Sequence, residues 1–152
     1  MRSQVVVAAA ASLLAFAVPP AACAKESLAE LIAQLNGMVS SEKSRYVVSL
    51  AGSPEGNTII LDSISKIDGK HFRYTVAARS LDPGKMHVGA DNGVFVKCMG
   101  EARCVKTIDA STGQVLIFFG HLEFGPFSAS PAEKQRALEL VRKVVTLAKA
   151  SP

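Results

Sequence analysis

The segment Val94–Ile108, VFVKCMGEARCVKTI, places Cys98 and Cys104 six positions apart, between two runs rich in β-branched residues. Such runs are typical of strands, and Gly100 between the cysteines allows the backbone to reverse tightly. A chain folded back at this point would bring the two cysteines close enough for a disulfide. The segment therefore predicts two adjacent antiparallel strands whose register is fixed by a Cys98–Cys104 bridge.

Metal or redox chemistry is the alternative use of two nearby cysteines. Zinc sites usually combine cysteines about two to four residues apart with two further Cys or His ligands, and redox pairs favour C-x-x-C. The nearest histidines, His87 and His121, lie on other predicted segments. We therefore expect a structural disulfide, with no metal site and no cofactor.

The first 24 residues have the layout of an export signal. Arg2 supplies positive charge, an apolar run extends from Val5 to Val18, and small residues surround the position after Ala24. This order is typical of a secretory signal peptide. We expect residues 1–24 to be removed and residues 25–152 to form a single domain. A disulfide in such a chain fits an oxidising space, the bacterial periplasm or the exterior.

Cys23 allows a second interpretation of the same leader. A lipidated Cys23 would become the mature N-terminus and hold a structural envelope protein on a membrane. Pro20 stands where bacterial lipoprotein signals usually carry leucine, although Ala21 and Ala22 suit that signal. Removal of Cys23 with the leader is the favoured prediction, and no membrane association is expected unless this cysteine is lipidated.

After residue 25 the sequence predicts an α+β domain with a helix at each end. Apolar residues spaced for one helical face precede Asn36-Gly37, which is expected to end the first helix. The sequence Ser130-Pro131-Ala132-Glu133 is a capping box that begins an amphipathic C-terminal helix. Between the helices, turn signals separate about seven strands. The expected strands are Tyr46–Leu50, Thr58–Ile67, His71–Arg79, Met86–Ala90, Val94–Cys98, Cys104–Ile108 and Val115–Phe119.

Short turns between these strands predict sequential antiparallel pairing. We therefore expect a meander of about seven strands that forms a bent sheet or a partial barrel, with a turn at Asp82-Pro83-Gly84. The last strand, Val115–Phe119, is apolar on both faces. We expect the C-terminal helix to cover it. An open antiparallel sheet with both helices on one face is the competing arrangement.

This order of elements resembles a pleckstrin-homology-like fold, in which bent antiparallel strands are capped by a C-terminal helix. The resemblance covers Tyr46 to Lys149 and lies in element order. The loop Gly52–Asn57, GSPEGN, has no Lys or Arg, so the resemblance does not carry over the basic inositol-phosphate motif. The strand, cysteine loop, strand and capped helix are also similar to those of uncharacterised small exported bacterial proteins, a likeness that implies no activity.

Charge and motifs limit the functions to consider. The net charge is +4, and the basic residues are scattered rather than gathered into the stripe of a nucleic-acid binder. The sequence has no phosphate loop, nucleophile elbow or HExxH motif. We expect an exported binding or protein-interaction module without cofactor. A small exported enzyme with an unrecognised site is the alternative.

One group of polar residues on a predicted strand offers a weak ligand face. His71, Arg73, Thr75 and Arg79 are spaced to share the polar side of that strand. Their donors would suit a small anionic ligand or an unknown protein partner. The alternative is an ordinary solvent-exposed face of the sheet.

Overall fold

The computed structural model describes residues 26–39, 46–53, 57–100, 102–128 and 130–150. The predicted leader, residues 1–24 with Cys23, lies outside the described residues. Two α-helices, eight strands and one short 3-10 helix follow in chain order. They are α1 (Leu28–Met38), β1 (Tyr46–Gly52), β2 (Thr58–Ser65), β3 (His71–Ala77), η1 (Ala78–Ser80), β4 (Leu81–Val88), β5 (Val94–Cys98), β6 (Val105–Asp109), β7 (Val115–Phe119), β8 (His121–Phe124) and α2 (Pro131–Ala150).

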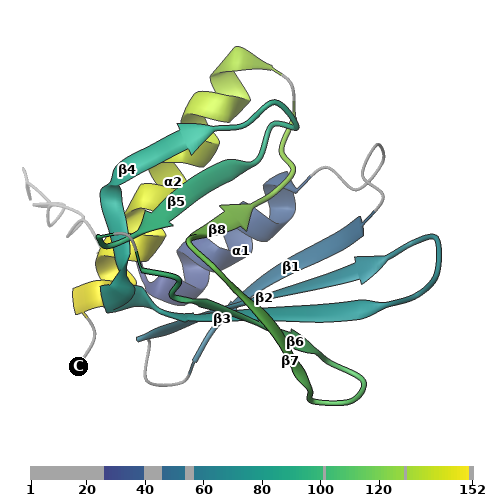
Figure 1. Cartoon of the computed structure of the whole chain (residues 1–152). Helices are drawn as coiled ribbons and strands as arrows, with labels where there is room; N and C mark the ends of the chain where they lie inside the picture. Colours follow the sequence, from purple (N-terminus) through teal and green to yellow (C-terminus); the bar gives the residue numbers. More distant parts are fainter. Residues whose placement is uncertain (1–25, 40–45, 54–56, 101, 129, 151–152) are drawn as a thin grey trace, which may run out of the picture.

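The strands form two antiparallel sheets (Figure 1). Together with the two helices they give the α+β fold that the sequence predicts. One sheet has five strands in the order β1-β2-β3-β6-β7, and the other has three in the order β4-β5-β8. Neither sheet closes into a barrel. The pairing is not sequential throughout, because β3 pairs with β6 instead of β4.

The 3-10 helix η1 is where the chain leaves the five-stranded sheet. Ala78 in η1 and Leu81 at the start of β4 are both completely buried, and α2 packs against both elements. This burial draws β4 and β5 onto α2, and β6 is then free to pair with β3. Short turns predicted a meander, but burial of these apolar residues against a helix decided which strands are neighbours.

The disulfide between Cys98 and Cys104 is present, with the two Cα atoms 5.8 Å apart. The predicted hairpin around it is wrong. β5, which ends at Cys98, pairs with β4 and β8, whereas β6 pairs with β3 and β7. Both sides of β5 are therefore occupied, and the disulfide connects one sheet to the other.

Two further elements differ from the predicted boundaries. The predicted turn at Asp82-Pro83-Gly84 lies inside β4, where the register shifts between Leu81 and Met86. The Asp82 side chain accepts a hydrogen bond from the Gly84 N–H at 3.0 Å, so a local side-chain turn forms within the strand. The connection after β7 contains an additional strand, β8, which pairs with β5.

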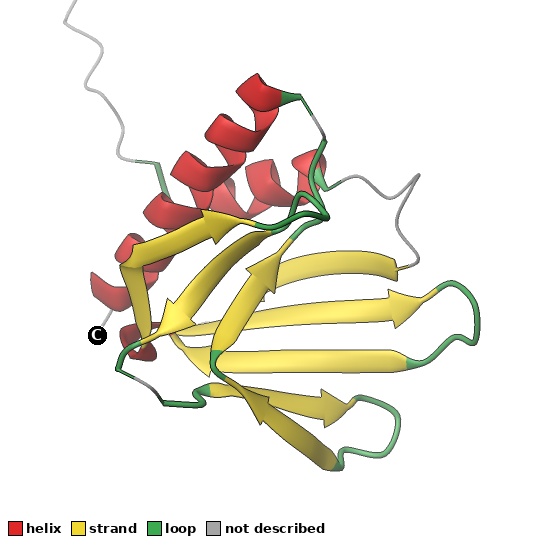
Figure 2. Ribbon diagram, turned by 45° about the horizontal axis from the view of Figure 1, so that its top comes forward, coloured by secondary structure: helices red, strands yellow, loops and turns green. Residues whose placement is uncertain are grey.

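The core lies between the helices and the two sheets (Figure 2). α1 begins with a capping box, in which the Ser27 hydroxyl accepts from the Glu30 N–H and the Glu30 carboxylate accepts from the Ser27 N–H. Leu31 and Leu35 of α1 are buried. α2 buries one apolar stripe against α1, η1, β4 and β5. The buried residues of α2 are Ala137, Leu140, Val141, Val144, Val145 and Ala148.

Candidate interaction surface

Strand β7 exposes all five of its apolar side chains. Their exposed fractions lie between 36% at Phe119 and 47% at Leu116. The prediction that the C-terminal helix covers this strand is wrong, because the apolar stripe of α2 is already buried against α1 and the three-stranded sheet. β7 stands at the outer margin of the five-stranded sheet (Figure 2), with β6 as its neighbour on one side.

The opposite edge of the same sheet is protected by a side chain. Asn36 of α1 donates from Nδ2 to the Leu50 carbonyl at 2.8 Å, and its Oδ1 accepts from the Leu50 N–H at 2.7 Å. Both polar groups of one β1 residue are thereby satisfied. An edge strand with open backbone groups can pair with another chain, so this side chain closes part of the β1 edge.

β7 has few of the features that usually protect an edge strand. Proteins blunt edges with charged residues, proline, bulges or short strands. Residues 110–120 contain no charged side chain and no proline. Strand β7 does carry one bulge, because its pairing with β6 passes from Ile117 to Val115 and skips Leu116. In the smaller sheet, β4 combines a bulge with Pro83, and β8 is four residues long.

A row of five rings continues the surface of β7 across both sheets. His87 on β4 stacks on Phe95 on β5, and Phe95 contacts His121 on β8, each with ring centroids 5.2 Å apart. His121 contacts Phe119, the last residue of β7, at 6.2 Å. Phe119 contacts Tyr74 on β3 at 6.5 Å. The exposed strand therefore joins an aromatic surface that sequence spacing did not predict.

A pair of carboxyl groups lies beside this row. Burial and the neighbouring Asp91 raise the pKa of Glu123 to about 7. A hydrogen bond with Glu123 is the main reason that the pKa of Asp91 lies below its usual range. A protonated Glu123 thus donates to an ionised Asp91. Glycine at position 93 leaves room for the Glu123 carboxyl in this position, since a Cβ there would overlap it.

The four residues of the predicted ligand face are placed on two elements. His71 and Arg73 on β3 both bond to the Asp62 carboxylate of β2, at 2.9 and 2.8 Å. Thr75 is also on β3, and Arg79 lies in the 3-10 helix η1. Burial opposes ionisation of Asp62, but the bonds from Arg73 and His71 hold its pKa below the usual range. This carboxylate thus engages two of the four donors within the protein.

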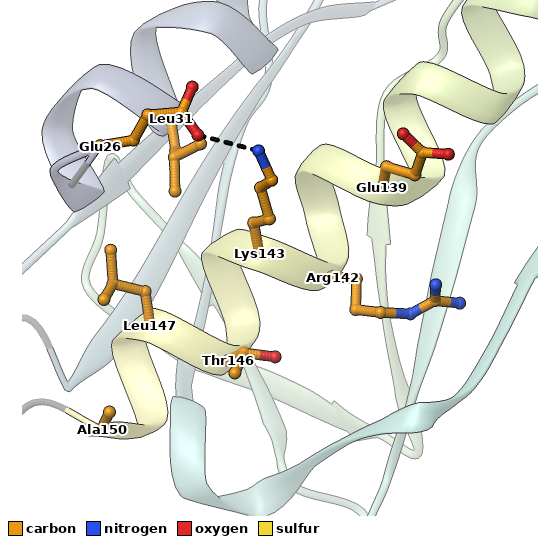
Figure 3. A pocket seen from close by; sticks show the side chains of 8 residues that line it. All are labelled: Glu26, Leu31, Glu139, Arg142, Lys143, Thr146, Leu147 and Ala150. Atoms are coloured by element: carbon orange, nitrogen blue, oxygen red, sulfur yellow. Dashed lines mark hydrogen bonds and ion pairs between the residues drawn. The ribbon is translucent and has the colours of Figure 1, made fainter. Parts of the chain in front are cut away.

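A hollow of about 590 Å³ lies between the start of α1 and α2 (Figure 3). Leu31, Leu147 and Ala150 give it an apolar lining. Glu26 and Lys143 form an ion pair of 2.8 Å beside it. The described residues that line it include no histidine and no cysteine, and its polar lining consists of Glu26, Glu139, Arg142, Lys143 and Thr146.

Within the described part of the chain, no three His, Cys, Asp or Glu side chains are grouped closely enough to hold a metal ion. Neither α1 nor α2, the described helices, combines the length and the apolarity needed to cross a bilayer. No family model, curated protein or solved structure matches this chain. The resemblance to the pleckstrin-homology-like element order therefore stays a prediction.

Proposed function

We propose that the protein is an exported interaction module that binds an extended, apolar segment of a partner protein along the free edge of β7. In such β-strand addition, main-chain hydrogen bonds to the edge strand provide affinity, and side-chain contacts on alternate residues provide specificity. The protein would need no cofactor for this activity.

The single observation that carries the proposal is an apolar edge strand that is exposed along its whole length. Val115–Phe119 is apolar at each position and at least 36% exposed at each. Scattered exposed apolar residues are ordinary, but contiguous ones usually mark an interaction site. The contrast with β1, where Asn36 bonds to the edge backbone, supports a binding role for the open edge.

The placement of the histidines and carboxylates also favours a binding module over an enzyme. An enzyme with an unrecognised site should hold a histidine and a carboxylate together in a cavity. The His71–Asp62 pair lies on a partly exposed sheet face and shares its carboxylate with Arg73. The hollow between the helices is lined by other residues.

Export is supported by the leader sequence together with the disulfide. A bridge between Cys98 and Cys104 fits an oxidising compartment, and residues 1–24 fit a cleaved signal. The intact mass of the protein isolated from its native envelope fraction tests both. We expect a chain that begins at Lys25 with both cysteines oxidised. A mass that includes acyl chains on Cys23 would instead establish the lipid-anchored alternative.

Selection from a random peptide library displayed on phage tests the binding activity. The target is residues 25–152, kept at nanomolar concentration. We expect enrichment of peptides with a run of apolar β-formers and no proline. Fluorescence anisotropy with one labelled selected peptide should show binding that Ile117→Lys weakens at least about tenfold, since a buried charge costs more than the 1.4 kcal/mol of a tenfold change.

Ile67→Lys is the matched control for this measurement. Ile67 is 76% exposed and lies in the turn after β2, away from the edge of β7. The control should bind the peptide as well as the unchanged protein does. Selected peptides that bind the Ile117→Lys protein equally well, or that protect the α1–α2 hollow from hydrogen exchange instead of β7, would overturn the proposed function.

A further inference from the structure

We propose that the partner segment bound along β7 carries a glutamate between apolar residues, and that Lys106 on the neighbouring strand β6 selects it. This inference rests on the proposed function and deepens it, because it names the chemistry of the segment and the residue that recognises it. Lys106 is then a specificity-determining residue one strand behind the open edge.

The register of β6 with β7 divides the side chains of β7 between two faces of the sheet. Ile117 pairs with the buried Thr107, so both side chains point to the inner face, where the core lies. Phe118 pairs with Lys106, and both therefore point to the outer face. The helices lie on the inner side (Figure 2). A strand added to β7 would present alternate side chains to these two faces.

Lys106 is a partly buried cation on the outer face, with apolar neighbours. The register places it between Thr75 on β3 and Phe118 on β7, and Ile108 follows two positions along β6 on the same face. Within the described part of the chain, Lys106 takes part in none of the ion pairs. Charges at an interface are usually matched by opposite charges of the partner, so Lys106 favours an acidic residue in the bound segment.

Asp62 lies on the same face but is not the counter-charge of Lys106. Its strand, β2, is separated from β6 by β3. The Asp62 carboxylate also accepts hydrogen bonds from Arg73 at 2.8 and 3.1 Å and contacts His71 at 2.9 Å. The acid that complements Lys106 is therefore expected from the partner.

The spacing of strands sets the position and length of this acidic side chain. Neighbouring strands lie ~4.8 Å apart, so a residue opposite Phe118 on the added strand is about 10 Å from Lys106. Lysine and glutamate can join their charged ends over this distance, and glutamate clears the Phe118 ring more easily than the shorter aspartate. The residues before and after the glutamate would face Ile117 and Phe119 on the inner side, where apolar side chains fit.

Peptide selection on Lys106→Met tests this inference. Methionine keeps an unbranched side chain of similar length and removes the charge. Peptides selected on unchanged residues 25–152 should be enriched in glutamate at one position between two apolar residues, with aspartate less frequent. Peptides selected on Lys106→Met should keep the apolar residues and lose the enrichment of glutamate.

Fluorescence anisotropy with one selected peptide measures the contact directly. Lys106→Met should bind this peptide about fivefold more weakly, and a peptide with glutamine in place of the glutamate should lose as much on the unchanged protein. Combining the two changes should cost no more than either alone. The loss should shrink at high salt. Lys106→Glu should prefer a peptide with lysine at that position.

Lys85→Met is the matched control, because it removes the same charge from β4 in the smaller sheet. It should bind the selected peptide as well as the unchanged protein does. Far-UV circular dichroism and thermal unfolding establish that each variant is folded.

The outcomes separate this inference from the proposed function. Peptides that depend on Ile117 but show no enrichment of glutamate would overturn the inference and leave the binding activity standing. An enrichment of glutamate that persists on Lys106→Met, or independent effects of the two changes, would also overturn the role of Lys106. A selection without β7-dependent peptides would overturn both proposals.

Discussion

Thr107 and Ile117 face each other across β6 and β7, and their burial is the reverse of what their chemistry favours. The polar Thr107 is 3% exposed, whereas the apolar Ile117 is 46% exposed. Within the described residues, the Thr107 hydroxyl oxygen has no hydrogen-bond partner. Thr107 is flanked by Tyr74 on one side and Ile117 on the other, so its neighbours cover it while the outer strand stays open.

Replacing Thr107 by valine should stabilise the protein. Valine has nearly the same shape and keeps the strand preference, while it removes a buried hydroxyl that lacks a partner. A buried unsatisfied polar group costs about 1 to 3 kcal/mol, so we expect a gain of about 1 kcal/mol in the free energy of unfolding. Urea denaturation followed by circular dichroism measures this gain.

Thr58→Val is the control for this substitution. The Thr58 hydroxyl donates to the Asn57 side chain at 3.2 Å, so its removal should give no gain. A Thr107→Val protein that is less stable than the unchanged protein would show that the hydroxyl contributes a favourable interaction.

Asn36→Ala should destabilise the protein and open the second edge of the large sheet. The substitution leaves the N–H and C=O of Leu50 without their side-chain partners. We expect a loss of about 2 kcal/mol in urea unfolding and faster hydrogen exchange of the Leu50 amide. Asn36→Asp keeps the acceptor for the Leu50 N–H but places a carboxylate oxygen against the Leu50 carbonyl, so it should not recover the stability that Asn36→Ala loses. Equal stability of all three proteins would contradict this role of Asn36.

Removal of the disulfide should affect the junction of the two sheets more than the rest of the molecule. The bridge spans six positions, so loop entropy predicts a loss of about 2 kcal/mol for Cys98→Ala/Cys104→Ala. Hydrogen exchange in β6 and β7 should increase more than in β1 and β2, because the bridge holds the start of the β6–β7 hairpin on β5.

Chemical reduction of the unchanged protein is the matched experiment, because it breaks the bond without removing the sulfur atoms. It should reproduce the increased exchange of β6 and β7. An increase that is uniform over all strands would show that the bridge stabilises the whole fold and not the junction.

Glu123→Gln should remove a pH dependence of stability. The pKa of Glu123 is raised from 4.5 to about 7 by burial and by Asp91. Between these values the folded protein retains the proton and the unfolded chain releases it, so stability falls as pH rises from about 4.5 to 7. Glutamine can still donate to Asp91 and cannot ionise. The variant should therefore be more stable than the unchanged protein at pH 8, with a smaller difference at pH 5.

Urea unfolding at both pH values measures this difference. Glu139→Gln on the exposed face of α2 serves as the control, since the described contact of Glu139 is with Gln135 of the same helix. An advantage of Glu123→Gln that is the same at pH 5 and pH 8 would contradict the assignment.

Local signals in the sequence predicted most of the elements. Capping residues and apolar spacing located both helices, and six of the strands coincide with predicted ones apart from their ends. The predicted strand Met86–Ala90 shares only Met86–Val88 with β4. β8 was missed because its four residues, His121–Phe124, follow β7 after a single glycine, where no turn signal separates them. Local patterns predicted the turn at Asp82-Pro83-Gly84 but not that β4 continues through it, since a side-chain turn and a tight turn use the same residue types.

The candidate surface was accessible to sequence analysis only in part. The sequence showed that Val115–Phe119 is apolar on both faces. It could not show that this strand is left uncovered, because that depends on where α2 is placed. The row of rings could not be predicted from the sequence for a similar reason. Its members come from five strands and meet only through the register of the two sheets.

The sequence by itself determined the class of fold, the two helices, the antiparallel strands and the pairing of Cys98 with Cys104. These features depend on short-range backbone preferences and on the scarcity of cysteine. The tertiary structure alone decided that β6 pairs with β3, that the disulfide joins two sheets and that β7 is exposed. The physical reason is that the apolar face of α2 can be buried only once, and burial against α1 and the three-stranded sheet leaves β7 open to solvent.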